Sequence, residues 1–241
     1  MFSLFISVML LLCGVTAGLT KEYIFVSTTK NWTDAQAYCK QNYEDLATVT
    51  TAEENQIVYA LIGSTNRAWI GMYRSQINVK IWMWSDESSS FFFSWNIYQP
   101  SNSGGNQNCV EIEPGGWNDQ FCYANRMLLC YRFLVLVKEE KTWAEALDYC
   151  RSKYNGLASP TPETQEQFAD MEISQAQTER VWTGLRFMDG KWIWVSKNLE
   201  ANLDSLPSCP DLRYHCGTRN SKNQIWENRD CNEKLNFLCY K

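Results

Sequence analysis

Apolar residues recur at helical spacing in two segments of the chain, each of which begins with tryptophan. The positions are Trp32, Ala35, Tyr38 and Cys39 in one segment and Trp143, Ala146, Leu147 and Cys150 in the other. Steps of three and four place these residues on one face, so each segment is predicted to be an amphipathic helix with that face buried. A second, more polar helix is predicted at Thr51 to Leu61 and at Pro162 to Met171, where proline suits a helix start.

Farther along each half, the pattern changes to alternation. Short strands rich in aromatic and branched residues are predicted at Trp69 to Met72, Ile81 to Ser85 and Met127 to Tyr131, with counterparts in the second half. Residues 85–109 are rich in Ser, Asn, Gln and Gly, and a loop of this length inside a compact domain is commonly functional. The sequence therefore predicts an α+β fold with a long binding loop.

An internal repeat of about 110 residues underlies both patterns. The aligned landmarks are Lys30 to Cys39 with Lys141 to Cys150, Leu46-Ala47-Thr48 with Leu157-Ala158-Ser159, Trp69-Ile70-Gly71 with Trp182-Thr183-Gly184, and Trp82-Met83-Trp84 with Trp192-Ile193-Trp194. Trp117, Cys122 and Cys130 also have the same spacing as Trp226, Cys231 and Cys239. Two homologous domains are predicted, at residues 20–132 and 133–241, each of common domain size.

Composition and charge narrow the function classes. The 241 residues are 45% hydrophobic and 20% charged, which is typical of a globular protein. A net charge of −5 and the absence of a basic run argue against nucleic acid as a partner. His215 is the single histidine, and no GxSxG, P-loop or HExxH motif is present, so we expect no catalysis and no zinc site.

The N-terminus resembles a secretion signal. An apolar run from Leu4 to Leu12 is followed by Val15, Thr16 and Ala17, so residues 1–18 are predicted to be a signal peptide and the protein to be secreted. The alternative is a buried N-terminal helix or strand. A run this short does not span a membrane, and no later segment is longer. Cleavage would remove Cys13 and leave nine cysteines for a disulfide framework, an odd number.

These landmarks together resemble the C-type lectin-like domain, twice over and across nearly the whole mature chain. The matching features are the Trp-x-x-Ala-x-x-Tyr-Cys helix, the Trp-Ile-Gly strand, the Trp-x-Trp strand, the Gln-Pro loop, and Trp117-Asn118-Asp119 followed by two cysteines. The resemblance implies two tandem domains of the family's short form, each with two helices, small antiparallel sheets and a long loop region. It also implies the disulfides Cys39–Cys130, Cys109–Cys122, Cys150–Cys239 and Cys216–Cys231, and a candidate cis proline at Pro100.

In sugar-binding members of this family, a calcium ion held by the long loop and the next strand coordinates two sugar hydroxyls. The resemblance places ligand-binding residues at Gln99, Ser101, Gln107, Asn118 and Asp119, and the calcium ligands at Gln99, Gln107, Asn118 and Asp119. Only Asp119 is charged, whereas calcium binds more tightly as carboxylates are added. We therefore predict a degenerate calcium and sugar site in the first domain. The plainer alternative is that Asn118 and Asp119 cap a turn and Trp117 is a core residue.

The second domain departs further from this pattern. Leu206 and Tyr214 stand where oxygen ligands are needed, and Glu227 and Asn228 follow Trp226. No calcium is expected here, and the domain is predicted to be a scaffold or a protein-binding module. Its loop offers a candidate recognition surface made of Arg213, Tyr214, His215 and Arg219, or else a solvated loop.

Two further residues carry predictions. Cys209 has no counterpart in the first repeat, so it is the predicted unpaired cysteine, either forming a covalent dimer or remaining a capped or buried thiol. Asn31 opens a glycosylation sequon, Asn31-Trp32-Thr33.

The function expected from the sequence is recognition of extracellular glycans or glycoproteins, mainly by the first domain. The alternative is a calcium-independent protein-interaction module that keeps the lectin fold without sugar binding.

Overall fold

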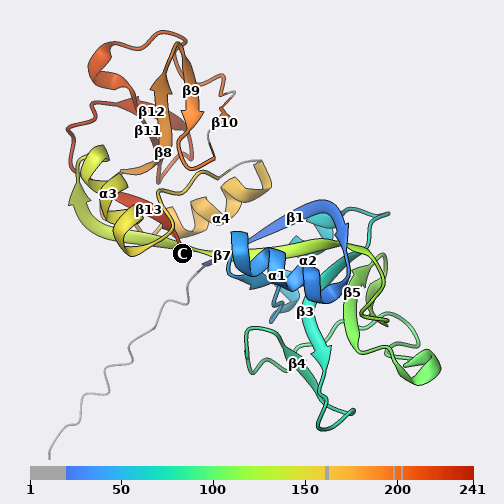
Figure 1. Ribbon diagram of the computed structural model, residues 1–241. Helices are drawn as coiled ribbons and strands as arrows, with labels where there is room; N and C mark the ends of the chain where they lie inside the picture. The colour runs from blue at the N-terminus through green and yellow to red at the C-terminus, as the bar shows by residue number, and fades with distance from the viewer. Residues whose placement is uncertain (1–19, 161–162, 198, 202) are drawn as a thin grey trace, which may run out of the picture.

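The computed structural model describes residues 20–160, 163–197, 199–201 and 203–241. The elements of the first half are β1 (Thr20–Lys30), α1 (Trp32–Asn42), β2 (Asp45–Leu46), α2 (Ala52–Ile62), β3 (Ala68–Arg74), β4 (Trp82–Trp84), the 3₁₀ turn η1 (Ser103–Gly105), β5 (Cys109–Glu113), β6 (Gly116–Gln120) and β7 (Arg126–Lys141). Those of the second half are α3 (Trp143–Lys153), α4 (Glu163–Ile173), β8 (Arg180–Met188), β9 (Lys191–Trp194), β10 (Leu199–Glu200), the 3₁₀ turn η2 (Leu212–Tyr214), β11 (Cys216–Asn220), β12 (Trp226–Arg229) and β13 (Leu235–Tyr240). The predicted α+β fold is confirmed, and Figure 1 shows two lobes connected by β7.

The first helix of each domain begins at a tryptophan for the same physical reasons. Asn31 caps α1 by accepting from the amide of Asp34, and Thr142 caps α3 in a capping box with Glu145. The ring nitrogen of Trp32 donates to the carbonyl of Ile70 at 2.9 Å, and that of Trp143 donates to the carbonyl of Thr183 at 2.9 Å. The apolar face of each helix is thereby fixed against β3 or β8.

Strand β7 joins the two domains into a continuous sheet. Its first part pairs with β1 and its second part with β13, the two registers meeting at Leu134. The sheet follows the order β10-β9-β8-β13-β7-β3-β5-β6, with the other strands branching from it. Strand β7 is much longer than the predicted strand at 127–131, because residues 134–141 find a partner in β13 that is about 100 residues away in sequence. The predicted boundary between residues 132 and 133 lies within this strand.

The two lobes also share packed side chains. Tyr23 of β1 contacts Phe168 of α4 with ring centroids 6.0 Å apart, and the hydroxyl of Thr20 donates to Glu172 at 2.6 Å. Trp117 is fully buried in the same cluster, as a core residue should be. Figure 1 shows α4 beside β1, so the second lobe packs directly against the first.

A buried ion pair lies near this junction. Arg132 of β7 bonds the carboxylate of Glu22, and its guanidinium stacks on the ring of Tyr240 at 3.2 Å. A pocket of about 350 Å³ adjoins it and includes Lys197. Burial, together with the positive charge of Arg132, lowers the pKa of Lys197 to about 8.

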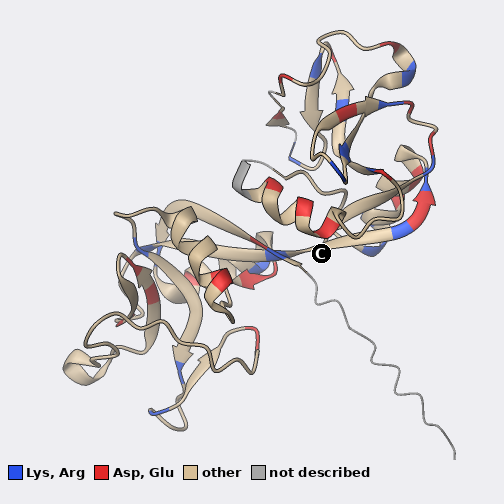
Figure 2. Ribbon diagram, turned by 180° about the vertical axis from the view of Figure 1, so that it is seen from behind, with Lys and Arg blue, Asp and Glu red and all other residues tan. Residues whose placement is uncertain are grey.

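Four disulfides connect the elements: Cys39–Cys130, Cys109–Cys122, Cys150–Cys239 and Cys216–Cys231. These are the pairs that the family resemblance implies. Cys209 is free and exposed. Figure 2 shows that segments of Lys and Arg and segments of Asp and Glu alternate along the ribbon of both lobes.

Candidate functional site

The long loop of the first domain brings four of the five predicted ligand positions together. The peptide bond between Gln99 and Pro100 is cis, and the side-chain oxygen of Gln99 accepts from the amide of Ser101 at 2.9 Å. The side-chain oxygen of Gln107 accepts from the hydroxyl of Ser101 at 3.1 Å and from the amide of Ser103 at 2.5 Å. The two glutamine oxygens that could face a metal are therefore bonded within the loop.

The carboxylate of Asp119 on β6 completes this arrangement. It is fully buried, and its two oxygens accept from the backbone amides of Ser101 at 2.9 Å and Asn102 at 2.8 Å. The fifth position, Asn118, donates its side-chain amide to Glu111 of β5 at 2.8 Å instead. Asp119 thus connects the loop to the sheet, while Asn118 is bonded to the neighbouring strand.

Arg74, at the end of β3, is a residue of this site that sequence reasoning missed. Its guanidinium donates to Asp119 at 3.1 Å and to the carbonyl of Val79 at 2.7 Å, and it stacks on Trp82 at 4.2 Å. The side chain of Arg74 is only 10% exposed. The internal repeat offered a clue, because the equivalent position in the second domain is Phe187 and an arginine is therefore not required by the fold.

The residues present do not fit a calcium ion. Calcium takes six to eight oxygen ligands and depends on carboxylates for its affinity, but Asp119 is the sole carboxylate among the five positions and already pairs with Arg74. Within the described ranges, no three His, Cys, Asp or Glu side chains cluster as metal ligands. The guanidinium supplies the positive charge that the buried carboxylate of Asp119 requires.

A pocket of about 550 Å³ lies beside this ion pair, between the start of α1, the end of β3 and the long loop. Trp32 and Tyr73 form an aromatic wall, with ring centroids 5.5 Å apart. The lining also includes three exposed side-chain amides, those of Gln76, Asn106 and Asn108. The pocket therefore combines ring surface with hydrogen-bonding groups.

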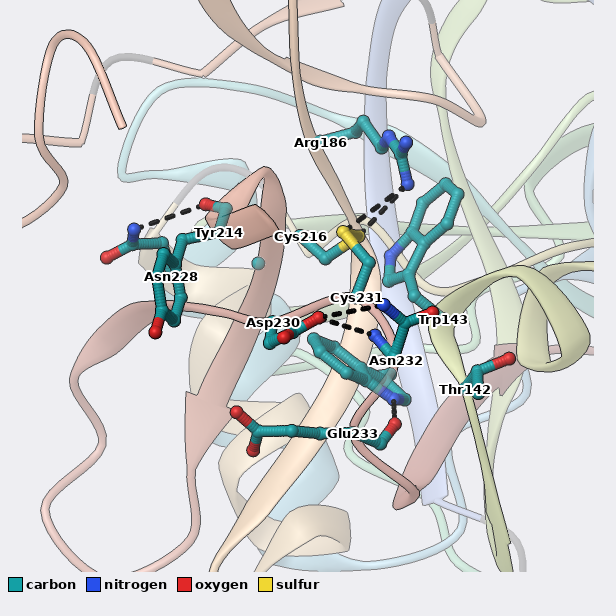
Figure 3. Close-up of a disulfide and its surroundings, with 12 residues drawn as sticks. Thr142, Trp143, Arg186, Tyr214, Cys216, Asn228, Asp230, Cys231, Asn232 and Glu233 are labelled. Atoms are coloured by element: carbon teal, nitrogen blue, oxygen red, sulfur yellow. Dashed lines mark hydrogen bonds between the residues drawn. A yellow bond between two sulfur atoms is a disulfide. The ribbon is translucent and has the colours of Figure 1, made fainter. Parts of the chain in front are cut away.

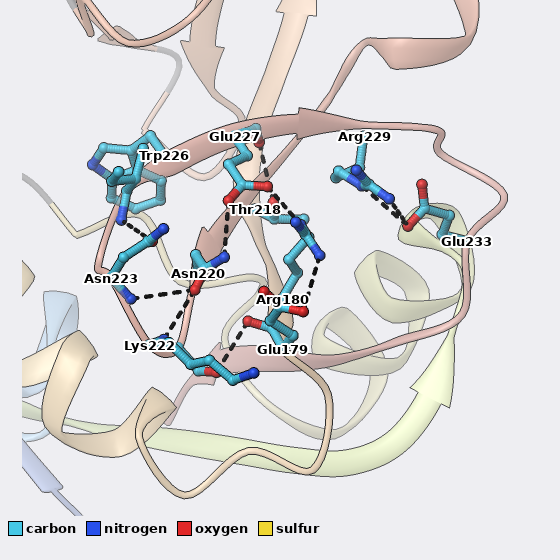
Figure 4. Close-up of polar contacts among 12 residues, drawn as sticks. Glu179, Arg180, Thr218, Asn220, Lys222, Asn223, Trp226, Glu227, Arg229 and Glu233 are labelled. Carbon is cyan, nitrogen blue, oxygen red and sulfur yellow. Dashed lines mark hydrogen bonds and ion pairs between the residues drawn. The ribbon is translucent and has the colours of Figure 1, made fainter.

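The corresponding positions of the second domain are engaged in internal contacts. Glu227 pairs with Arg180 at 2.5 Å and accepts from Asn220 at 2.9 Å, as Figure 4 shows. Asn228 donates to the carbonyl of Tyr214 at 3.1 Å (Figure 3), and Leu206 packs into a hydrophobic cluster. Side-chain oxygens suited to a metal are not gathered at these described positions, and the expected absence of calcium remains a prediction.

The candidate recognition surface of the second domain is not assembled as predicted. Arg219 is buried, bonds Asp170 at 2.8 and 2.9 Å, and stacks on Trp226 at 4.6 Å. His215 packs against Phe187, with ring centroids 5.1 Å apart. Arg219 therefore connects β11 to α4 in the interior and does not form part of a recognition surface.

The predicted glycosylation site at Asn31 lies within the described residues, whereas the predicted signal peptide lies outside them. The side-chain amide nitrogen of Asn31 donates to Asp34 at 2.7 Å, while its oxygen caps α1. The predicted signal peptide, residues 1–18, falls outside the described residues, as does Cys13. In the part of the chain that the structure describes, no helix has the length and apolar character needed to cross a membrane.

Comparison with known proteins places the chain in a family. The family model described as "Lectin C-type domain" matches residues 28–132 and again residues 139–241. The chain belongs to the C-type lectin family. Each matched segment contains the two helices and the two disulfides of its domain.

Individual relatives match one domain's length of this C-type lectin. A C-type lectin of the lectoxin type from Thrasops jacksonii is 33% identical over 111 residues, which are 42% of this chain and 70% of that protein. "C-type lectin domain family 17, member A" from Homo sapiens is 30% identical over 46% of this chain. This second match covers 29% of the human protein, so the chain spans only part of that relative.

Solved structures also align over about one domain's length of the chain. Human lithostathine is 27% identical, with a TM-score of 0.43, covering 46% of this chain and 91% of that one. The mouse scavenger receptor C-type lectin carbohydrate-recognition domain is 26% identical, with a TM-score of 0.44, covering 47% of this chain and 91% of that one.

Proposed function

We propose that this C-type lectin is a secreted, non-enzymatic recognition protein whose first domain binds extracellular carbohydrate without calcium at Asp119. The observation that carries the proposal is the Arg74–Asp119 ion pair. This ion pair connects β3, β6 and the long loop through direct contacts. A calcium ion bound in the loop would make the same kind of connection. The loop is therefore held against the sheet by contacts within the protein.

The adjacent pocket suits a sugar. Sugars have apolar faces that stack on aromatic rings and hydroxyls that pair with amides. The ring of Tyr73 and the amides of Asn106 and Asn108 offer both kinds of contact within about 550 Å³, a volume in the usual range for small ligands. Support for this ligand class also comes from the names of the relatives, which are lectins.

A glycan array probed in calcium and again in chelator tests the proposal. We expect binding to persist in chelator and to fall at least tenfold in the double variant Asn106→Ala and Asn108→Ala, because two hydrogen-bonding groups are removed. Asn125→Ala, an exposed amide outside the pocket, is the matched control and should bind normally. Sugar binding that disappears with the chelator would contradict the proposal.

Protein recognition is a second candidate, favoured by exposed apolar side chains in the first domain. Ile77, Phe91, Ile97 and Tyr98 are 77–99% exposed, and all come from one stretch of chain. Exposed apolar side chains mark a protein-binding surface when they form one contiguous patch. Under this alternative, a partner would bind after glycosidase treatment, and binding would fall in Phe91→Ser and Ile97→Ser while the glycan array remained blank.

The free cysteine, Cys209, bears on whether the protein forms a dimer. Because its thiol is exposed and has no disulfide partner in the described part of the chain, we propose a covalent dimer through Cys209 in an oxidising compartment. Non-reducing electrophoresis of the secreted protein should show a dimer that is absent in Cys209→Ser. A monomer in both lanes would exclude the covalent dimer and leave the carbohydrate proposal unaffected.

A further inference from the structure

Arg186, at the end of β8, has no carboxylate partner among the described residues although it is half-buried. Its guanidinium lies over the ring of Trp143 at 4.6 Å and donates to the disulfide sulfurs of Cys216 at 3.0 Å and Cys231 at 3.7 Å, as Figure 3 shows. Sulfur is a weak acceptor, so these contacts satisfy the charge poorly. Burial alone lowers the pKa of Arg186, with no carboxylate to oppose the shift.

Most of the other arginines of the protein are paired, and the two besides Arg186 that form no ion pair among the described residues, Arg151 and Arg213, are exposed to water. Within the described ranges, seven of them lie within 4 Å of a carboxylate: Arg67, Arg74, Arg126, Arg132, Arg180, Arg219 and Arg229. Arg186 forms no such ion pair there, and a partly buried cation without a counter-charge is destabilising. Arg186 is thus a partly buried cation without a carboxylate partner in the described part of the chain, whereas the other arginines that are partly buried each have one.

The first domain shows that the fold does not require this charge. Tyr73 faces Cys109 across the sheet in the same way that Arg186 faces Cys216. The ring of Tyr73 packs on Trp32, and Arg186 packs on Trp143, the equivalent tryptophan. One architecture therefore accommodates a neutral aromatic residue in one domain and an uncompensated cation in the other.

Arg186 lines a groove of about 400 Å³ that is otherwise mostly apolar. Its walls are Trp143, Leu147, Met188, Ile193 and Val195, and the second charged residue is Arg151, from the last turn of α3. No acidic residue of the described chain lines it. A complementary ligand therefore has an apolar body and a negative group placed to reach Arg186.

We propose that this groove binds an acidic segment of a partner protein, in which a glutamate or aspartate is flanked by apolar side chains. The carboxylate would pair with Arg186, assisted by Arg151, and the flanking side chains would cover Trp143, Leu147 and Met188. A sugar is excluded as the occupant, because the walls lack the amide and hydroxyl groups present in the pocket of the first domain. The inference is independent of the ligand proposed for the first domain.

An NMR titration of the full mature protein tests this, with arginine side chains labelled with nitrogen-15. The probes are the N-acetylated, C-amidated tripeptide leucyl-glutamyl-leucine and its uncharged leucyl-glutaminyl-leucine counterpart. We expect the acidic tripeptide to bind saturably and shift the Arg186 side-chain resonance, and the neutral tripeptide to bind at least tenfold more weakly.

The decisive variant is Arg186→Tyr, which installs the residue of the first domain. It should weaken binding of the acidic tripeptide at least tenfold, while the melting temperature stays equal or rises, because an uncompensated charge is removed. Arg213→Tyr, an exposed arginine of the same domain that does not line the groove, should bind like the native protein. Equal binding of the two tripeptides, unchanged binding in Arg186→Tyr, no saturable binding, or a fall of several degrees in the melting temperature of Arg186→Tyr would each overturn the inference.

Discussion

Replacing Arg74 by methionine tests the ion pair at the centre of the first domain. The substitution keeps the length and apolar stem of the side chain but removes the charge that faces Asp119. It also removes the hydrogen bonds to Val79 and Gln107 and the stacking on Trp82. Asp119 would then remain fully buried, with two backbone amides as its main compensation.

The expected cost follows from this geometry. Breaking a buried pair by removing one partner costs about 3–5 kcal/mol, and the two remaining amides place Arg74→Met near the lower end, about 3 kcal/mol. Because the two lobes share a core, we expect them to unfold together. For a unit of their combined size, such a loss lowers the melting temperature by about 6–12 °C.

Urea unfolding of a double-mutant cycle checks the reasoning. Asp119→Asn combined with Arg74→Met removes both charges, so the double variant should be at least about 1 kcal/mol more stable than the sum of the single effects predicts. Lys191→Met, which removes a half-exposed lysine from its pair with the half-exposed Glu200, should cost less than about 1 kcal/mol. Strict additivity, or an effect of Arg74→Met as small as that of Lys191→Met, would refute the account of the ion pair.

Three further predictions concern stability and can be checked by thermal unfolding. Lys197→Met should raise the melting temperature at pH 7. The pKa of Lys197 in the folded protein is about 8, below the ordinary value of 10.5, so the unfolded chain binds more protons than the folded chain between these pH values. The gain in melting temperature of the variant over the native protein should therefore shrink as the pH rises to 10. Equal melting temperatures at pH 7 would contradict this prediction. Gly71→Ala should lower the free energy of unfolding by about 1–3 kcal/mol, because the added methyl group would lie 2.6 Å from the hydroxyl of Ser85. Gly184→Ala should lower it by a similar amount, because its methyl group would lie 2.6 Å from the hydroxyl of Ser159. Native-like stability of either variant would argue against this packing. Asn31→Ala should cost about 1 kcal/mol by removing the cap of α1, whereas Asn31→Ser, whose hydroxyl can accept from the same amide, should keep most of it, and equal effects would exclude capping.

The sequence was most informative where structure depends on nearby residues. The predicted helix at Thr51 to Leu61 corresponds to α2 at Ala52–Ile62, because Thr51 caps it through the amide of Glu54. Trp117 could be assigned to the core from its size and type alone, and it is fully buried. Such features depend on local spacing, caps and apolar volume.

Features that depend on distant residues were less accessible. The bond from Arg74 to Asp119 joins positions 45 apart in the sequence, and nothing adjacent to Arg74 marks it as the partner. The burial of Arg219 depends on Asp170 of α4, 49 positions away, so a loop arginine that suggested a surface turned out to be a packing residue. A position-by-position comparison of the two repeats could have pointed to Arg74, because the second repeat has no arginine at the equivalent position. The same comparison points to Arg186, which has no equivalent arginine in the first repeat.

The central claim is that the ion pair of Arg74 with Asp119 replaces calcium in ordering the long loop. Calorimetric unfolding of the mature protein, first in millimolar calcium and then in chelator, tests it directly. We predict melting temperatures that agree within about 1 °C, since a site that binds no ligand gains no stability from it. A calcium site filled at about 100 times its dissociation constant would add about 2.7 kcal/mol, so a rise of several degrees in calcium would contradict the claim.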